Sequence, residues 1–315
     1  MEEKQTGERK STVRNGNLSN ARFFEAASLR GIEKGKVPPD FGCRAIFHSW
    51  EGSMNYLKRA EHERLSENSA EVAAAYLGMI DGLRFTGLVS IGAGEGIVDE
   101  QLFAKHQPAF EYYVPVDISR WLLCTAFDRL SRLAPIPWVI NCDVENLGPA
   151  ETTLFNGLAG ARLFACLGNV LGNTDRHEQF GFKAIGQLMS KPADWLLLSV
   201  AVGRFERVKD PNETKNGFHI WDMVFAGVSY HREPEVRGMR ADDFDLILQT
   251  DEDTGSSSIV FIYKPWNQLA FTLRRYDLKP FLNWLDRKMG FVVERFELLD
   301  TGAGFDAGTF LLKRR

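Results

Sequence analysis

Cysteine is scarce in this 315-residue chain, and no arrangement of cysteine and histidine suits a metal ion. The four cysteines form no CxxC pair, and the six histidines form no HExxH or comparable spacing. This pattern argues against a disulfide scaffold and a metal site, and it predicts reduced thiols. The residues concerned are Cys43, Cys124, Cys142, Cys166, His48, His62, His106, His177, His219 and His231.

Long apolar runs and an excess of one charge are also missing. No window of about 18 apolar residues predicts a membrane-spanning helix, and residues 1–20 lack the apolar core of a secretory signal. With 38 Lys and Arg against 42 Asp and Glu, the net charge is -4, which argues against a nucleic-acid-binding surface. We therefore expect a cytoplasmic protein without a membrane or nucleic-acid partner.

Short apolar runs alternate with helical segments from Gly87 onward. This alternation is typical of an α/β protein whose parallel sheet is covered on both faces. The glycine-bearing loop Asp300–Gly308 lies between the last two runs and is compatible with an antiparallel pair. We therefore predict a doubly wound, mostly parallel sheet of seven strands with an antiparallel last strand. The predicted strands are 87–92, 112–117, 137–142, 162–167, 194–200, 291–299 and 309–313.

The remaining segments predict additions to this sheet. Residues 1–20 are polar and predict a mobile tail, and residues 21–80 predict a helical N-terminal segment that lines the substrate site. Residues 204–268 interrupt the pattern and predict an α+β insertion that covers the substrate, with a hairpin of Phe244–Gln249 and Ile259–Tyr263. The cofactor-binding sheet domain would then comprise residues 81–203 and 269–315.

Three features converge at the carboxyl ends of the predicted strands, where open α/β sheets bind ligands. Gly92-Ala93-Gly94-Glu95-Gly96 follows the first strand, Asp117 ends the second, and Asp143 follows the third. Glycines let a ligand approach the backbone, Asp117 can accept two ribose hydroxyls, and Asp143 can meet an adenine amino group. The GxGxG spacing suits S-adenosylmethionine (SAM) better than NAD, which needs a pyrophosphate cradle. Taken singly, each feature is also compatible with a tight turn, a solvated acid or a loop cap.

Longer motifs carry a family resemblance. The chain resembles the ergothioneine-pathway histidine Nα-methyltransferases, a SAM-dependent family whose relatives include enzymes acting on prenylated tryptophan. The most specific motif is Tyr113-Val114-Pro115-Val116-Asp117-Ile118-Ser119, which is similar to the family's YVPxDxS. The other matching segments are Tyr56–Glu61, Ser69–Ala73, Ile91–Gly94, Cys142–Glu145 and Leu167–Asn173.

The resemblance implies a Rossmann-like methyltransferase fold and a role for each matching residue. Cofactor binding, with S-adenosylhomocysteine (SAH) as product, would fall to the glycine loop, the strand-end acids and the Leu167–Asn173 motif. Tyr56 and Asn173 would bind the substrate and serve as the catalytic pair, although no general base is evident. The implied cofactor residues are Gly92, Ala93, Gly94, Asp117, Asp143, Val144 and Gly168.

Departures from the family concern the substrate. Val208 stands where the family has a tyrosine that contacts the substrate carboxylate, and Val98 stands near a position that is often lysine. The stretch Phe271–Tyr276 lacks the glutamate and serine that hold the imidazole in the histidine enzymes. A site built to hydrogen-bond a ring loses its selectivity when those partners are absent. We therefore expect an amino acid or amino-acid-derived metabolite other than histidine, as in secondary metabolism.

Aromatic side chains of the insertion are candidates for closing the substrate site. Phe218, Trp221 and Tyr230 would contact the substrate and exclude water, or would only pack the insertion onto the sheet. Two alternatives to N-methylation stay open, namely a nicotinamide-dependent oxidoreductase and a catalytically idle SAM-binding scaffold. Methylation of oxygen or carbon is also compatible with the same cofactor pocket.

Overall fold

The computed structural model describes residues 21–26, 29, 42–62, 65–106, 109–146, 149–174, 179–208, 217–231, 238–300 and 306–315. The tail predicted over residues 1–20 lies outside these ranges and stays a prediction.

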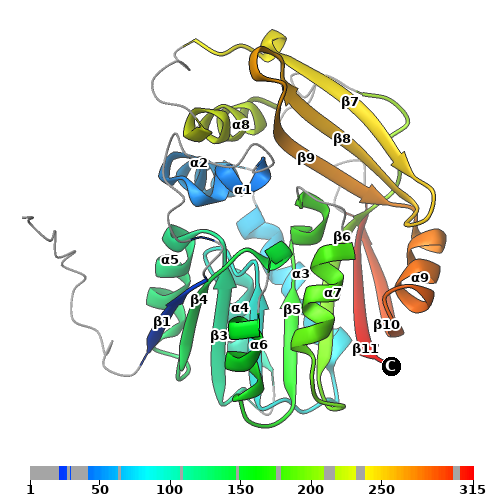
Figure 1. Ribbon diagram of the computed structural model, residues 1–315. Coiled ribbons are helices and arrows are strands. Elements are labelled where there is room, and N and C mark those ends of the chain that lie inside the picture. Colours follow the sequence, from blue (N-terminus) through cyan, green and yellow to red (C-terminus); the bar gives the residue numbers. More distant parts are fainter. Residues whose placement is uncertain are drawn as a thin grey trace, which may run out of the picture.

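Five parallel strands form the centre of the sheet in the order β4-β3-β2-β5-β6. Every residue of β2, β3 and β5 is buried, because helices cover both faces of the sheet (Figure 1). These strands are β2 (Gly87–Ile91), β3 (Tyr112–Asp117), β4 (Trp138–Asn141), β5 (Arg162–Cys166) and β6 (Trp195–Val202). The intervening helices are α4 (Ile97–Lys105), α5 (Arg120–Leu130), α6 (Pro149–Asn156) and α7 (Gln179–Leu188).

The chain completes this sheet with an antiparallel strand. After α9 (Leu278–Arg287), β10 (Phe291–Asp300) leads into β11 (Asp306–Arg314), which runs antiparallel to both β10 and β6. The predicted doubly wound, mostly parallel sheet with an antiparallel last strand is therefore confirmed. The predicted number of seven strands is too low, because four strands at the edge and in the cap bring the sheet of the described residues to eleven.

The N-terminal segment departs from the helical prediction at its start. Arg22–Glu25 forms strand β1, which pairs in parallel with the outer side of β4. Phe23 and Phe24 favour extended backbone, and the open edge of β4 supplies the hydrogen-bond partners that a short helix would lack. The helices begin later, as α1 (Cys43–His48), α2 (Trp50–His62) and α3 (Leu65–Ile80).

A cap lies over the carboxyl ends of the parallel strands (Figure 1). It consists of α1, α2, α8 (Gly217–His231), β7 (Phe244–Asp251), β8 (Ser256–Tyr263) and β9 (Gln268–Tyr276). The hairpin β7–β8 confirms the predicted pair. Strand β9 joins β8 and also meets the end of β6 at Val202 and Tyr276, so the sheet continues into the cap.

The predicted α+β insertion came without a position for its helix, and the structure places that helix at α8. Its apolar side chains pack under β8 and β9, and α1 and α2 lie against it. Gly227 permits the contact with α1, because a β carbon at this position would lie 2.5 Å from Ile46 Cγ1. Long-range packing therefore fixes a helix that its local sequence signals only weakly.

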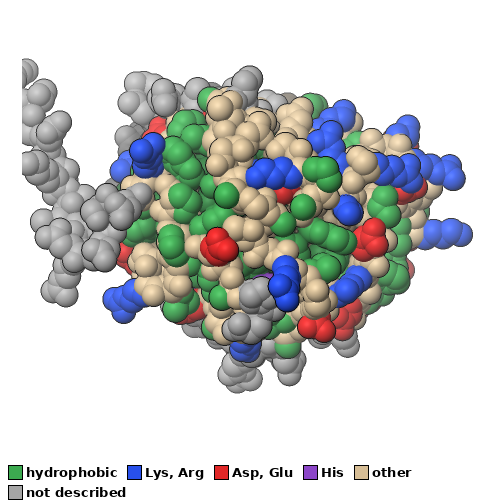
Figure 2. All heavy atoms as spheres, turned by 90° about the horizontal axis from the view of Figure 1, so that it is seen from below, with side chains coloured by type: hydrophobic (Ala, Val, Ile, Leu, Met, Phe, Trp, Pro, Cys, Tyr) green, Lys and Arg blue, Asp and Glu red, His purple; other side chains and the backbone are tan. Residues whose placement is uncertain are grey.

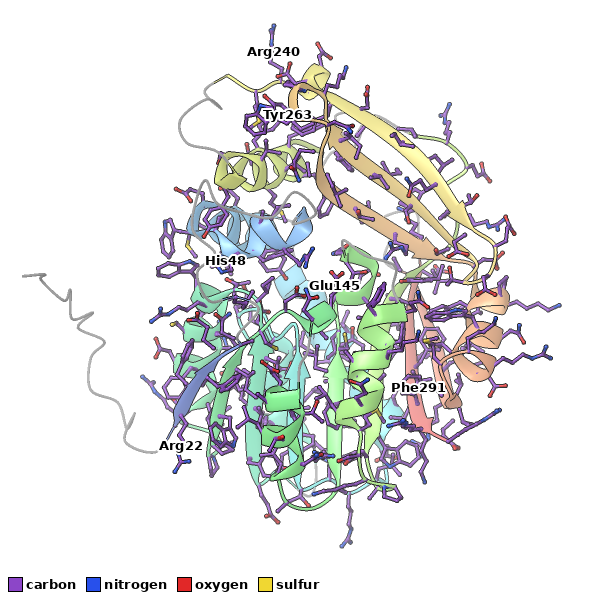
Figure 3. All side chains as sticks on the ribbon, viewed as in Figure 1. Arg22, His48, Glu145, Arg240, Tyr263 and Phe291 are labelled. Carbon is purple, nitrogen blue, oxygen red and sulfur yellow. The ribbon has the colours of Figure 1, made fainter. Side chains whose placement is uncertain are left out.

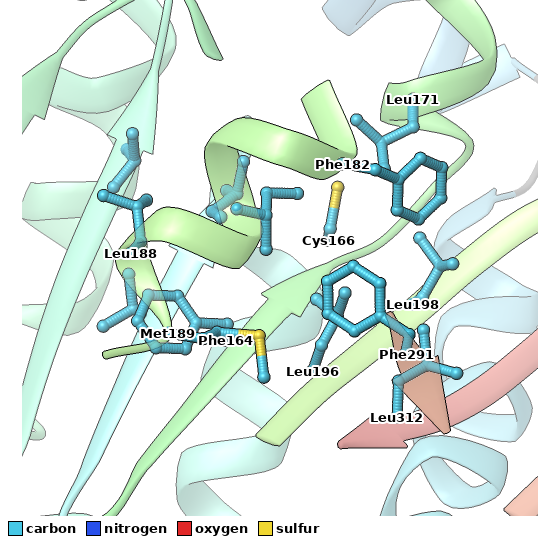
Figure 4. Packing of buried hydrophobic residues seen from close by; sticks show 14 of the residues in the cluster. Phe164, Cys166, Leu171, Phe182, Leu188, Met189, Leu196, Leu198, Phe291 and Leu312 are labelled. Carbon is cyan, nitrogen blue, oxygen red and sulfur yellow. The ribbon is translucent and has the colours of Figure 1, made fainter. Parts of the chain in front are cut away.

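The core beneath α7 anchors the loop that follows β5. Phe182 of α7 packs with side chains of β5, β6 and β10, and Leu171 of the loop is buried in the same cluster (Figure 4). Burial of Leu171 fixes the short 3-10 turn Val170–Asn173 at the end of β5. This turn carries part of the candidate site.

Candidate functional site

A cavity of about 150 Å³ lies between the carboxyl ends of β2 to β5 and the cap. Glu145, one of its lining residues, lies below α1 and α2 at the ends of the strands (Figure 3). The opposite face of the molecule carries basic, acidic and hydrophobic side chains together and lies away from the strand ends that form the cavity (Figure 2). The cavity brings together most of the residues predicted from the sequence, namely Tyr56, Gly92, Gly94, Asp117, Asp143, Val144, Gly168 and Asn173.

Two glycines leave space in this cavity. Gly94 and Gly168 have φ angles of 55° and 71°, a region that L-amino acids with side chains rarely adopt. Among the residues that the structure describes, a β carbon on Gly168 would meet no atom within 4 Å, and one on Gly94 would meet only the Tyr56 hydroxyl at 4.0 Å. Both positions therefore present bare backbone to the cavity, as a ligand lying along the loop requires.

Gly92 has a different role in the same loop. A β carbon on Gly92 would lie 2.4 Å from Val170 Cγ2, so this glycine permits the loop after β2 to pack against the turn after β5. The close contact holds the two cavity-forming loops together.

Asp117 is a buried carboxylate at the end of β3. Its Oδ2 accepts from the backbone amide of Gly94 at 2.9 Å, and its Oδ1 accepts from that of Ser119 at 2.7 Å. Burial raises the pKa of Asp117 to about 6, although backbone hydrogen bonds from Ser119, Gly94 and Ile118 favour the charged form. A buried acceptor linked to the glycine loop suits the hydroxyls of a ribose.

Asp143, after β4, forms a buried ion pair with Arg44 of α1. The distance between Asp143 Oδ2 and Arg44 Nη1 is 2.9 Å, and both residues are almost fully buried. The Asn146 side chain also donates to Oδ2, and the Glu145 amide donates to Oδ1 at 2.9 Å. Arg44 itself lines the cavity, so the N-terminal segment contributes a cation there.

Arg44 was missed by sequence reasoning. The only signal is a charged residue within the otherwise apolar run Cys43-Arg44-Ala45-Ile46-Phe47. Its partner lies 99 positions away, so only the fold reveals the pair.

Asn173 is held at the cavity by its neighbour Asn169. Asn169 adopts a left-handed φ of 62°, and its Oδ1 accepts from the Ala201 amide at 3.0 Å. Its Nδ2 donates to Asn173 Oδ1 at 3.5 Å, which is a long contact. The next residue, Thr174, also lines the cavity and accepts from Arg274 Nη1 at 3.0 Å.

Tyr56 reaches the cavity from α2. Its ring packs edge-on against Phe47, which also lines the cavity, with ring centroids 5.5 Å apart. Because its hydroxyl lies beside Gly94, Tyr56 stands over the glycine loop on the side of the cap.

Other predicted residues lie elsewhere. Trp221 is buried against Phe244 and Phe261 within the cap and does not line the cavity. Tyr230 Oη lies 2.9 Å from His48 Nδ1, also away from the cavity lining. The Ala93 amide donates to the Val116 carbonyl, and the Phe218 side chain lies outside the described residues. The substrate roles of these three aromatic residues stay predictions.

A family model for histidine-specific, SAM-dependent methyltransferases matches residues 46–219, which is more than half of the chain. The chain belongs to this family. The resemblance stated from the sequence motifs is therefore confirmed, and the protein is a SAM-dependent methyltransferase. The hydrogen-bonding groups that line the cavity fit the adenosyl part of SAM, and the open space beside its glycines fits the methionine part.

Solved methyltransferase structures are similar to the chain at low sequence identity. The 1,6-didemethyltoxoflavin-N1-methyltransferase of Burkholderia thailandensis is 12% identical, with 83% of this chain and 86% of that chain covered and a TM-score of 0.47. The magnesium protoporphyrin IX methyltransferase of Synechocystis PCC 6803 is 12% identical, with 89% and 98% covered and a TM-score of 0.46. No curated protein sequence matches the chain.

Over the described ranges, no three His, Cys, Asp or Glu side chains gather as a metal site. None of the helices in those ranges combines the length and hydropathy needed to cross a bilayer.

Proposed function

We propose that this methyltransferase transfers a methyl group to a nitrogen atom of an amino acid, or of an amino-acid-derived metabolite, other than histidine. The observation that carries the proposal is that Tyr56 and Asn173 line the same cavity as the glycine loop and Asp117. Two polar side chains from different elements thus face the space where a methyl donor and an acceptor would meet.

Different residues along the cavity would bind different parts of the cofactor. Gly92, Gly94 and Gly168 would lie beside the methionine part, with the backbone of Ala93 in the same loop. Asp117 would accept the ribose hydroxyls, while Asp143 and Val144 would hold adenine. The burial of Asp117 and its hydrogen bond from Gly94 support this order.

When bound, SAM supplies a methyl group on a sulfonium that leaves as a neutral thioether. The protein therefore has mainly to align the nucleophile with the methyl carbon, at about 3 Å. Tyr56 and Asn173 offer one hydroxyl and one amide for this alignment. An amine must arrive unprotonated, and the aromatic wall of Phe47 and Tyr56 disfavours a charged ammonium by excluding water.

Side chains of β9 support a substrate other than histidine. Arg274 is buried in the stretch where the histidine enzymes carry their imidazole-binding residues, and it donates to Thr174 Oγ1 and Ser258 Oγ. A guanidinium has only donors and cannot accept a hydrogen bond from an imidazole N–H. The apolar side chains of Phe47 and Leu167 line the cavity together with Tyr56 and favour an acceptor with an apolar part.

A titration with SAH and a turnover assay together test this proposal. The assay would offer histidine, tryptophan and their modified forms, and mass spectrometry would locate the new methyl group. N-methylation of a member other than histidine supports the proposal, whereas preferred turnover of histidine or methylation at oxygen or carbon contradicts it. SAH binding without any turnover would favour the idle scaffold. The family assignment leaves a nicotinamide-dependent activity without support.

The variant Asn173→Ala separates substrate binding from cofactor binding. We expect turnover to fall by at least tenfold, because removal of a hydrogen bond to a polar substrate costs about 1 kcal/mol or more. The SAH dissociation constant should stay within about twofold. Asn283→Ala, at an exposed position of α9, is the matched control and should change neither quantity. Equal losses of SAH binding and turnover in Asn173→Ala would assign Asn173 to the cofactor instead.

A further inference from the structure

We propose that Arg44 is a positioning residue for the cofactor. Its ion pair with Asp143 orients the carboxylate so that the other oxygen accepts a hydrogen bond from the adenine amino group. This inference rests on the proposed binding of adenine at Asp143. It adds a residue of the N-terminal segment to a site otherwise formed by the ends of the sheet strands.

The two oxygens of the Asp143 carboxylate accept different numbers of hydrogen bonds. Arg44 and Asn146 both donate to Oδ2, while the Glu145 amide donates to Oδ1. A carboxylate offers about four lone-pair positions, two on each oxygen. With respect to the donors that the structure describes, Oδ2 is therefore filled and Oδ1 keeps one position for a further donor. The adenine amino group is a donor of the required kind.

Because the ion pair between Arg44 and Asp143 is buried, the loss of one partner leaves the other without a substitute. Arg44 and Asp143 are 6% and 3% exposed, so little water is present to replace either partner. A buried carboxylate that loses its partner rotates toward another donor. Arg44 keeps the Asp143 carboxylate oriented, and this orientation is needed for Oδ1 to accept from a neutral amine.

The ion pair also joins the cap to the sheet. Arg44 belongs to α1, which packs on α8 of the cap, whereas Asp143 follows β4. A second buried link lies nearby, where the Ser53 and Ser119 hydroxyls of α2 and the β3–α5 junction are 2.8 Å apart. The cap must therefore lie against the sheet for the Asp143 carboxylate to keep the orientation in which it accepts from the adenine amino group. Cofactor affinity should depend on this contact.

Calorimetry with two ligands tests the proposal. SAH carries the adenine amino group, and S-inosylhomocysteine carries an oxygen in its place. Wild-type protein should bind SAH more tightly than the inosine analogue. Arg44→Met should weaken SAH binding about tenfold to hundredfold, as expected for a lost hydrogen bond to a charged group. It should also reduce the preference for SAH over the analogue.

Four further variants distinguish positioning from simple structural support. Arg44→Lys keeps the charge but loses the planar fork, so its SAH affinity should fall between those of wild type and Arg44→Met. In the double variant Arg44→Met/Asp143→Asn, no buried charge stays unpaired, and its SAH affinity should match that of Asp143→Asn alone. Arg295→Met removes an arginine that donates to the Met79 and Asp81 carbonyls far from the cavity, and it should leave both affinities unchanged.

Each outcome bears on a different claim. An unchanged SAH affinity in folded Arg44→Met overturns the inference. Equal weakening of both ligands also overturns it, because Arg44 would then only support the fold. If Arg44→Met does not fold, Arg44→Lys and the double variant decide the question by the same two-ligand comparison. Failure of wild-type protein to bind SAH would instead refute the proposed cofactor site.

Discussion

Asp117 shows how a single side chain couples the cofactor site to pH. Its pKa is raised to about 6 by burial, so the protonated form is favoured in the folded state relative to the unfolded chain. For an acid with a raised pKa, the stabilising contribution is full below the ordinary pKa, which is 3.8 for Asp, and is lost as the pH rises through about 6. The charged carboxylate that ribose requires is therefore obtained at some expense of stability near neutral pH.

We predict that SAH binding weakens as the pH falls below about 6. Protonated Asp117 accepts ribose hydroxyls less well, so the dissociation constant should rise by up to about tenfold per pH unit. Calorimetric titrations between pH 5 and 8 would measure this change. Asp117→Asn should remove the pH dependence and weaken binding throughout.

Asp99 provides the matched control for this prediction. Its pKa is also raised to about 6 by burial, but its carboxylate accepts from the Tyr113 hydroxyl and does not line the cavity. Asp99→Asn should therefore retain the pH dependence of SAH binding. A pH-independent affinity in wild-type protein would contradict the role assigned to Asp117.

The site residues that the sequence predicted correctly are those that a short stretch of neighbouring residues identifies. The glycine loop and Asp117 stand at strand ends, where spacing alone indicates their position, and they do line one cavity. Arg44 could not be predicted because its partner Asp143 is distant in sequence. For Trp221 the sequence left open contact with a substrate or packing of the insertion, and only the tertiary structure reveals that its ring packs against Phe244 and Phe261.

At the scale of elements, the loop after β2 is shaped by what its glycines leave open. Gly94→Ala would place a methyl group in the cavity at a residue with φ of 55°. We expect a loss of stability of about 1–2 kcal/mol from the left-handed backbone and a clear loss of SAH affinity from the blocked space. Thermal unfolding and calorimetry would measure the two effects separately.

Gly82→Ala separates strain from steric blocking. Gly82 has φ of 75°, and a β carbon there would meet no atom of the described ranges within 4 Å, but the residue follows α3 outside the cavity. This variant should lose similar stability and keep its SAH affinity. Normal SAH binding by folded Gly94→Ala would show that the cofactor does not lie along the loop.

Elements with strong periodicity were predicted well, and those that depend on distant partners were not. The central strands are continuous apolar runs that only a two-sided buried sheet accommodates. Strand β1 depends on the free edge of β4, and α8 depends on packing against α1 and β9. Neither partner is visible in the local sequence of the segment.

For the whole molecule, the arrangement places a cap of N-terminal helices and inserted strands over a cofactor-binding sheet (Figure 1). The two parts meet at one cavity, where Arg44 and Tyr56 come from the cap and Asp117, Asp143 and Asn173 from the ends of the sheet strands. Cofactor binding and substrate enclosure are therefore linked in the proposed function. In the proposed function the cap also selects the substrate, and β7, β8 and β9 of the cap lie beyond the residues 46–219 that the family model matches.

The most direct test of this account is a calorimetric titration of the intact protein with SAH at neutral pH. We predict saturable binding at one site per chain with a dissociation constant in the micromolar range, and loss of most of that affinity in folded Asp117→Ala. Absence of binding by folded wild-type protein, or equal binding by Asp117→Ala, would contradict the assignment of this cavity to the cofactor.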